Sequence, residues 1–230
     1  MEFNKKLRQL IKRHVPQFYH EYKAFIGSYY EDSNFLDYAL KRIFYKFKRG
    51  DYYVKNKNSV IWGNILMGKK SKLALRGGCY IQGYGKLFIG DYVNITQNCI
   101  VLSANHNIYN QDEHIKKETI IGDQCWIGSN ACIMAGVVLG PRTVVGAGSV
   151  VTKSFPDGYC IIAGNPAKIV KILNPDEYTP RKYDIEHYGY IPSYKFPEYK
   201  KNYLNHLKFK YDLRKVTSNT ELIRGSIIYK

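Results

Sequence analysis

The most regular feature of the chain is an aliphatic residue at every sixth position of its centre. Six such positions follow one another without a gap, at Ile121, Ile127, Ile133, Leu139, Val145 and Val151. The fourth position after each of the first five holds a small or slim side chain, namely Cys125, Ala131, Val137, Thr143 and Ser149. A period of six fits neither the 3.6-residue turn of a helix nor the alternation of a long strand. It predicts a chain that turns a corner every six residues, with stacked aliphatic side chains inside a triangular prism.

The same phase extends upstream, and glycine marks many of the repeats. Gly follows the aliphatic residue at positions 122, 128, 140 and 146, and the phase reappears at Ile89, Ile95 and Val101. We expect Gly or another small residue at each corner, because a large side chain would clash where the backbone turns. Looser spacing from Val60 onward places the start of the solenoid near residue 59. The alternative of a Gly-rich β-sandwich fits so strict a period poorly.

The segments on either side of the repeats have a different pattern. Residues 3–13 and 32–50 carry apolar side chains at helical spacing and are predicted helices. We expect them to cap the open end of the solenoid; a membrane-surface role for the first, basic helix is the alternative. Residues 1–58 are therefore predicted to be a helical cap, residues 59–173 the solenoid, and residues 174–230 a Tyr/Lys-rich extension. That extension could wrap a neighbouring surface, cover an acceptor site or be irregular.

Composition narrows the class of protein. The 230 residues are 45% hydrophobic with 8 Pro and 19 Gly, which excludes a disordered or collagen-like chain. The five cysteines are an odd number without CxxC spacing, so we expect buried thiols in a reducing compartment. No apolar run approaches the roughly 20 residues of a membrane-spanning helix, and the expected location is the cytoplasm. The charge of +16 is spread along the chain, which favours an anionic partner without indicating nucleic acid.

Candidate chemistry lies in a polar insertion at residues 105–118, between the repeats at Val101 and Ile121. Such an insertion must leave the prism as a loop. His106 stands where the last core strand ends, so rigid structure holds it while its ring stays reachable, as a general base requires. His114 is interpreted as a solvated loop residue. Because the repeat region has no third histidine, a three-histidine zinc site is not expected, and no metal is predicted.

Residues 89–173 resemble the hexapeptide-repeat O-acetyltransferases, and within that family the branch that acts on galactosides, maltose, nodulation factors, antibiotics and surface polysaccharides. The motifs that carry the resemblance are Asn105-His106, Trp126-Ile127-Gly128-Ser129, the stretch from Gly146 to Lys153, and the stretch from Ala163 to Lys168. The resemblance implies a mainly β, left-handed parallel β-helix, a homotrimer with active sites between subunits, and acetyl-CoA as co-substrate.

The resemblance also implies roles for individual residues. His106 matches the catalytic histidine, Trp126 an aromatic residue near the reaction centre, and Ser129 a residue at the thioester end of the cofactor. The pantetheine groove is matched by Ala147, Thr152 and Lys153, and the region of the nucleotide phosphates by Lys168 and Lys171. Lysines at that end of a solenoid would also attract the phosphates on electrostatic grounds. The partner of the second ring nitrogen of His106 is left open between Asn94 and a backbone carbonyl.

The implied reaction is direct acetyl transfer from acetyl-CoA to a sugar hydroxyl, with backbone N–H groups near Ser129 stabilising the oxyanion. The acceptor region departs from the sugar-acetylating members, which carry Asn and Asp where this chain has Arg76 and Tyr84. With Asn105, these residues are predicted to bind the acceptor. Arg76 suggests an acidic sugar or a lipid- or nucleotide-linked precursor of a surface polysaccharide. An N-acetyltransferase acting on an amino sugar and a non-catalytic binding solenoid are the alternatives, and weak membrane-surface association stays open.

Overall fold

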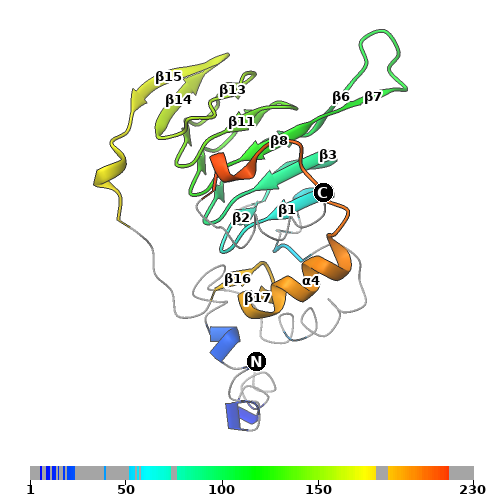
Figure 1. Ribbon diagram of the computed structural model, residues 1–230, viewed down its shortest axis with the longest axis vertical. Coiled ribbons are helices and arrows are strands. Elements are labelled where there is room, and N and C mark those ends of the chain that lie inside the picture. The colour runs from blue at the N-terminus through cyan, green and yellow to red at the C-terminus, as the bar shows by residue number, and fades with distance from the viewer. Residues whose placement is uncertain are drawn as a thin grey trace.

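The computed structural model describes residues 52–54, 56, 58–73, 77–179 and 186–217, together with isolated positions between residues 6 and 39 (Figure 1). The two helices predicted before the solenoid lie largely outside the described residues, and so does Arg76. Among the described residues, no helix combines the length and the apolar character needed to cross a bilayer.

Short parallel strands stack into a left-handed β-helix of about five turns, as the six-residue period predicts. The first face of the prism contains the first parts of β1 (Val60–Met67) and β3 (Tyr80–Ile89), then β5 (Ile100–Leu102), β10 (Cys132–Ile133) and β13 (Val150–Val151). The second face contains β2 (Lys72–Leu73), β4 (Asn94–Ile95), β9 (Trp126–Ile127), β12 (Val144–Val145) and β14 (Cys160–Gly164). The third contains the last parts of β1 and β3, then β8 (Glu118–Ile121) and β11 (Val138–Leu139). Strand β15 (Ala167–Ile172) ends the solenoid and is antiparallel to β14.

The core follows the repeat. The six aliphatic residues from Ile121 to Val151 are each at most 1% exposed, and the slim residues between them are at most 2% exposed. Each coil places its aliphatic residue over that of the coil before it, as in the register of Ile133 with Val101. The stacked aliphatic interior predicted from the sequence is therefore confirmed.

The clash expected at the repeat glycines is present, but it does not come from a turn at positive φ. Among the described residues, positive φ occurs at eight glycines and at seven residues with side chains, and the repeat glycines Gly90, Gly122, Gly128, Gly140 and Gly146 are not among them. The repeat glycines are instead required by the adjacent coil. A Cβ on Gly90 would lie 2.7 Å from the backbone nitrogen of Asp123, and one on Gly122 would lie 2.8 Å from the carbonyl carbon of Gly140. Stacking of the coils, and not the turn itself, excludes a side chain there.

The exposed edge of the first coil is covered by the C-terminal extension. After η1 (Pro175–Glu177), the extension forms β16 (His187–Tyr188), β17 (Ile191–Pro192), η2 (Ser193–Lys195) and α4 (Phe196–Tyr203), which lie against the β1–β2 end of the prism (Figure 1). The buried phenol of Tyr52 donates to the carbonyl of Met67 at 2.9 Å and accepts its N–H at 2.6 Å. Lys70 donates its backbone N–H to the carbonyl of His187. Backbone groups that a further coil would bind are thus satisfied.

Aromatic side chains hold this cover in place. The rings of Tyr188 and Phe196 stack with centroids 3.7 Å apart, and Tyr52 contacts both Phe196 and Tyr199 at 5.4 Å. The hydroxyl of Tyr194 donates to Glu21, which joins the N-terminal part of the chain to the same cover. Part of the tyrosine content of the chain is therefore explained by packing at this end.

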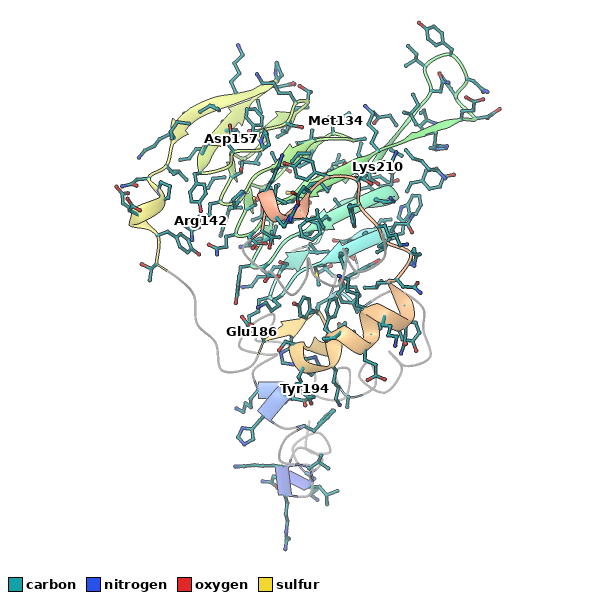
Figure 2. All side chains as sticks on the ribbon, viewed as in Figure 1. Met134, Arg142, Asp157, Glu186, Tyr194 and Lys210 are labelled. Atoms are coloured by element: carbon teal, nitrogen blue, oxygen red, sulfur yellow. The ribbon has the colours of Figure 1, made fainter. Side chains whose placement is uncertain are left out.

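The extension then returns along the third face of the prism to η3 (Leu213–Lys215). The carboxylate of Glu118 accepts the backbone N–H groups of Lys210, at 2.7 Å, and Tyr211, at 3.1 Å. Figure 2 shows Lys210 beside β8. Phe209 packs edge-on against Phe88 on the outer side of β3, with centroids 5.9 Å apart. Of the roles left open for the extension, the structure shows one: it wraps the solenoid of its own chain.

Candidate active site

A hairpin leaves the solenoid between its first and third faces and projects beyond the body of the molecule (Figure 1). It is formed by β6 (Ala104–His106) and β7 (His114–Lys116), which pair antiparallel with His106 opposite His114. The base of the polar insertion is therefore a pair of antiparallel strands. Seven residues, 107–113, lie between the two histidines.

Buried polar side chains fix the base of this hairpin. The hydroxyl of Ser103, at 0% exposure, donates to the carbonyl of Gln82 at 2.9 Å and accepts the N–H of Gly85 at 2.9 Å. The side-chain oxygen of Gln82 accepts the N–H of Ala104 at 3.0 Å. Ser103 and Gln82 therefore position the strand that carries His106. Neither residue could be recognised from the sequence, because an isolated Ser or Gln carries no motif.

The ring of His106 is exposed, and one of its nitrogens has a defined partner. Nδ1 lies 2.7 Å from the backbone carbonyl oxygen of Gln111, in the same hairpin. A carbonyl can only accept a hydrogen bond, so the neutral ring carries its hydrogen on Nδ1 and keeps a lone pair on Nε2. Of the two partners considered, the backbone carbonyl is the one present. Asn94 lies on the second face, paired with Trp126.

Aromatic rings continue from His106 toward the first coil, beside the edge between the first and third faces. The ring of His114 lies 4.2 Å from that of His106 and meets Tyr84 edge-on at 4.7 Å. Tyr84 in turn lies 5.6 Å from Trp62. Lys116 places its Nζ 4.3 Å from the centre of the Tyr84 ring. The expectation of a solvated His114 is wrong, because this half-buried ring packs between two others.

The residues matched to the cofactor groove lie on other parts of the prism. Ser129 and Ala147 are on the edge between the second and first faces, where Gly148 donates its N–H to the carbonyl of Ser129 at 2.8 Å. Thr152 and Lys153 follow β13 on the edge from which the hairpin leaves. Trp126 is 46% exposed on the outer side of the second face. Within one chain, therefore, His106 lies at one side of the first face, and Ser129 and Trp126 lie at or beyond its other side.

The remaining predicted residues lie near these edges. Lys168 and Lys171 are exposed on β15, in register with Ala163 and Ile161 of β14. Asn105 is half-buried on β6 in register with Ile115. Ser129 donates its hydroxyl hydrogen to Thr96 at 3.2 Å. To donate to an oxyanion instead, this hydroxyl must rotate.

Four of the five thiols, those of Cys79, Cys99, Cys125 and Cys160, are too buried for nucleophilic attack. Burial raises the pKa of Cys125 to about 12. A hydrogen bond shared by Cys79 and Cys99 lowers the pKa of Cys99 to about 7 and raises that of Cys79, but their exposed fractions are 2% and 0%. No cluster of three metal-ligating His, Cys, Asp or Glu side chains occurs in the part of the chain that the structure describes.

The strictest part of the six-residue repeat matches a known protein family. Residues 118–153 match the family described as bacterial transferase hexapeptide (six repeats). One relative is WbbJ of Escherichia coli strain K12, whose name gives it as an O-acetyl transferase of lipopolysaccharide biosynthesis. It is 28% identical over 169 residues, which cover 60% of this chain and 86% of WbbJ.

A second relative and a solved structure are also similar to the chain. The galactoside O-acetyltransferase of Escherichia coli strain K12 is 33% identical over 104 residues, which cover 43% of this chain and 51% of that enzyme. The chain thus spans about half the length of that relative. A solved structure of the hexapeptide-repeat acetyltransferase VCA0836 from Vibrio cholerae, in complex with acetyl coenzyme A, is 24% identical, with 70% of this chain and 90% of that chain covered and a TM-score of 0.49. The chain is thus similar to the hexapeptide-repeat transferases over residues 118–153, and to named O-acetyltransferases over 60% and 43% of its length.

Proposed function

We propose that the chain is an acetyl-CoA-dependent O-acetyltransferase that modifies a hydroxyl of a sugar in a surface polysaccharide or its precursor. The observation that carries the proposal is the contact between His106 Nδ1 and the carbonyl of Gln111. It holds an exposed imidazole at the rigid end of a hairpin with Nε2 available as a base. The named activities of WbbJ and the galactoside enzyme support the choice of acetyl transfer to a sugar.

The reaction follows from that geometry. Nε2 of His106 takes the proton of the acceptor hydroxyl while the hydroxyl oxygen attacks the thioester carbonyl carbon. Collapse of the tetrahedral oxyanion forms the ester and breaks the carbon–sulfur bond. The protonated His106 then returns the proton to the departing thiolate. Backbone N–H groups near Ser129 are proposed to stabilise the oxyanion.

The surface proposed to bind acetyl-CoA is exposed and carries lysines. A Cβ added to Gly148 would meet nothing within 4 Å, so no described residue crowds the edge beside Ala147, where the pantetheine arm is proposed to lie. Thr152 and Lys153 are exposed, as are Lys168 and Lys171 on β15. Exposed ammonium groups at this end suit the nucleotide phosphates.

We also propose a homotrimer. Outward-facing apolar residues form a row along the first face, in which Val60 is 54%, Tyr80 38% and Ile100 39% exposed. The row continues through the half-buried Cys132 and Val150. An apolar row of this length favours contact with another copy. Packing across this face would bring the His106 hairpin of one subunit toward the Ser129 edge of its neighbour.

A thiol-release assay with acetyl-CoA and a panel of sugars tests the proposal, followed by analysis of the product linkage. We expect release that depends on acceptor and on His106, and a product whose acetyl group is lost in mild base, as an ester is. A base-stable amide would favour the N-acetyltransferase alternative. Binding of CoA without turnover on any acceptor would favour a binding solenoid and overturn the proposal.

A further inference from the structure

The aromatic residues beside His106 form a surface that the acetyl-transfer reaction does not itself require. Trp62 and Tyr84 come from two successive coils, and His114 and Lys116 come from β7 of the hairpin. We call these four residues the aromatic platform. Tyr84 contacts Trp62, His114 and Lys116, and the ring of His114 contacts that of His106. The platform is therefore continuous with the proposed base.

The platform is partly exposed to solvent. Trp62 is 39% exposed, Lys116 is exposed, and Tyr84 and His114 are half-buried. Large rings left partly in water forgo much of the free energy that full burial would give. Flat amphipathic rings suit a sugar, which presents C–H groups on its faces and hydroxyls at its rim.

Lys116 gives the platform a charge. Its Nζ lies over the Tyr84 ring at 4.3 Å, and no carboxylate of the described residues lies within ion-pair distance of it. The neighbouring ion pair of Lys86 with Glu118, at 3.2 Å, is on the third face, on the other side of the hairpin base. The ammonium group is thus positioned at the platform with its charge available for an anion.

We propose that the acceptor is an acidic sugar whose ring lies on Trp62 and Tyr84 and whose carboxylate binds the ammonium group of Lys116. This assignment rests on the proposed acetyltransferase function and names its substrate class. Lys116 thus has the role of binding an acidic acceptor, which the sequence predicts for Arg76. In this arrangement a hydroxyl of the bound sugar faces Nε2 of His106.

The test uses pairs of acceptors that differ only in charge: N-acetylneuraminic acid and its methyl ester, and galacturonic acid and its methyl ester. Wild type, Lys116→Met and Lys117→Met are compared in the full chain. Lys117 is the matched control, because it is an adjacent exposed lysine without a contact to Tyr84 in the described structure. We expect Lys116→Met to lower kcat/KM for at least one acid about 10- to 100-fold, the range of a charge-assisted hydrogen bond, and to leave its ester unchanged. Lys117→Met should change neither.

Two further measurements separate the possible failures. Direct binding of the same acids by wild type and Lys116→Met, measured by saturation-transfer NMR, tests the platform without turnover. The oligomeric state of Trp62→Ala, which should bind both members of a pair more weakly, shows whether Trp62 acts in assembly instead. Equal transfer to acids and esters by wild type and Lys116→Met would overturn the acidic-sugar assignment and leave the acetyltransferase proposal standing. Acid binding that depends on Lys116, without transfer to any acceptor, would support the platform and overturn the proposed function.

Discussion

The backbone carbonyl of Gln111 lies 2.7 Å from Nδ1 of His106, so the hairpin that carries the histidine also fixes its tautomer. In many enzymes a carboxylate from a distant part of the chain orients the catalytic imidazole. Here the partner is five residues further along the chain. The orientation of the base therefore depends on the conformation of one hairpin.

Shortening that hairpin should slow acetyl transfer without weakening the binding of acetyl-CoA. Replacing residues 107–113 by an Asn-Gly turn keeps β6 and β7 paired but removes the Gln111 carbonyl. We expect kcat to fall at least about 10-fold, because general-base catalysis needs the correct ring nitrogen in place. Acetyl-CoA binding, measured by calorimetry, should stay within about 2-fold, because the residues proposed to bind it lie elsewhere. An unchanged kcat would contradict the role given to Gln111.

Ser103 should contribute to stability. Ser103→Ala leaves the buried N–H of Gly85 without its partner, whereas the carbonyl of Gln82 keeps the backbone N–H of residue 103, and we expect a loss of about 1–3 kcal/mol in the free energy of unfolding. Denaturant unfolding measures this cost. Ser154→Ala is the control: its hydroxyl accepts the N–H of Val138 at an exposed position, and we expect a change within about 0.5 kcal/mol.

The cover over the first coil should be a main source of stability. Tyr52→Phe removes the hydroxyl that binds both backbone groups of Met67, so we expect a loss of about 1–3 kcal/mol in the free energy of unfolding. Tyr109→Phe, at a tyrosine that is 93% exposed on the hairpin, should have no measurable effect. Equal stability of the two variants would show that the cover does not depend on this hydrogen bond.

The reactivity of Cys132 tests the proposed trimer. It is half-buried in the apolar row of the first face, whereas Cys79, Cys99, Cys125 and Cys160 are buried. A trimer packed on that face should protect Cys132 from maleimide, and Ile100→Lys should release monomers in which Cys132 alone reacts quickly. Mass spectrometry and light scattering on the same samples check this. Fast labelling of Cys132 in an intact trimer would place the subunit contact on another face.

Lys70 should make stability depend on pH in alkaline solution. Burial lowers the pKa of this lysine to about 8, against a partial opposing effect of Glu186. Between about pH 8 and 10.5 the unfolded chain keeps the proton that the folded chain has lost, so this lysine makes stability rise with pH. Lys70→Met should raise stability at pH 7 and flatten the rise, as measured by denaturant unfolding at several pH values. An identical pH dependence in both proteins would contradict this contribution.

The sequence predicts the solenoid well because its information is local and repeated. One side chain in six must enter the prism, so Ile121 to Val151 define the coils without reference to any distant contact. His106 was predictable for a related reason, since a polar insertion in a strict repeat has no place except outside it.

Other features depend on contacts that leave no local signal. The partner of His106 is a backbone carbonyl, which any residue at position 111 would provide. Hydrogen bonds join segments far apart in the chain, as between Tyr52 and Met67 and between Glu118 and residues 210–211. Trp62 belongs to no sequence motif, and its proposed role follows only from its contact with Tyr84 on the next coil.

The most direct test of the central claim is the rate of ester formation by wild type, His106→Ala and His206→Ala with acetyl-CoA and a transferable sugar. His206 is an exposed histidine of the C-terminal extension and serves as the matched control. We expect His106→Ala to lower kcat by about 10²- to 10⁴-fold with acetyl-CoA affinity retained, and His206→Ala to keep the wild-type rate. Wild-type turnover by His106→Ala would show that His106 is not the base.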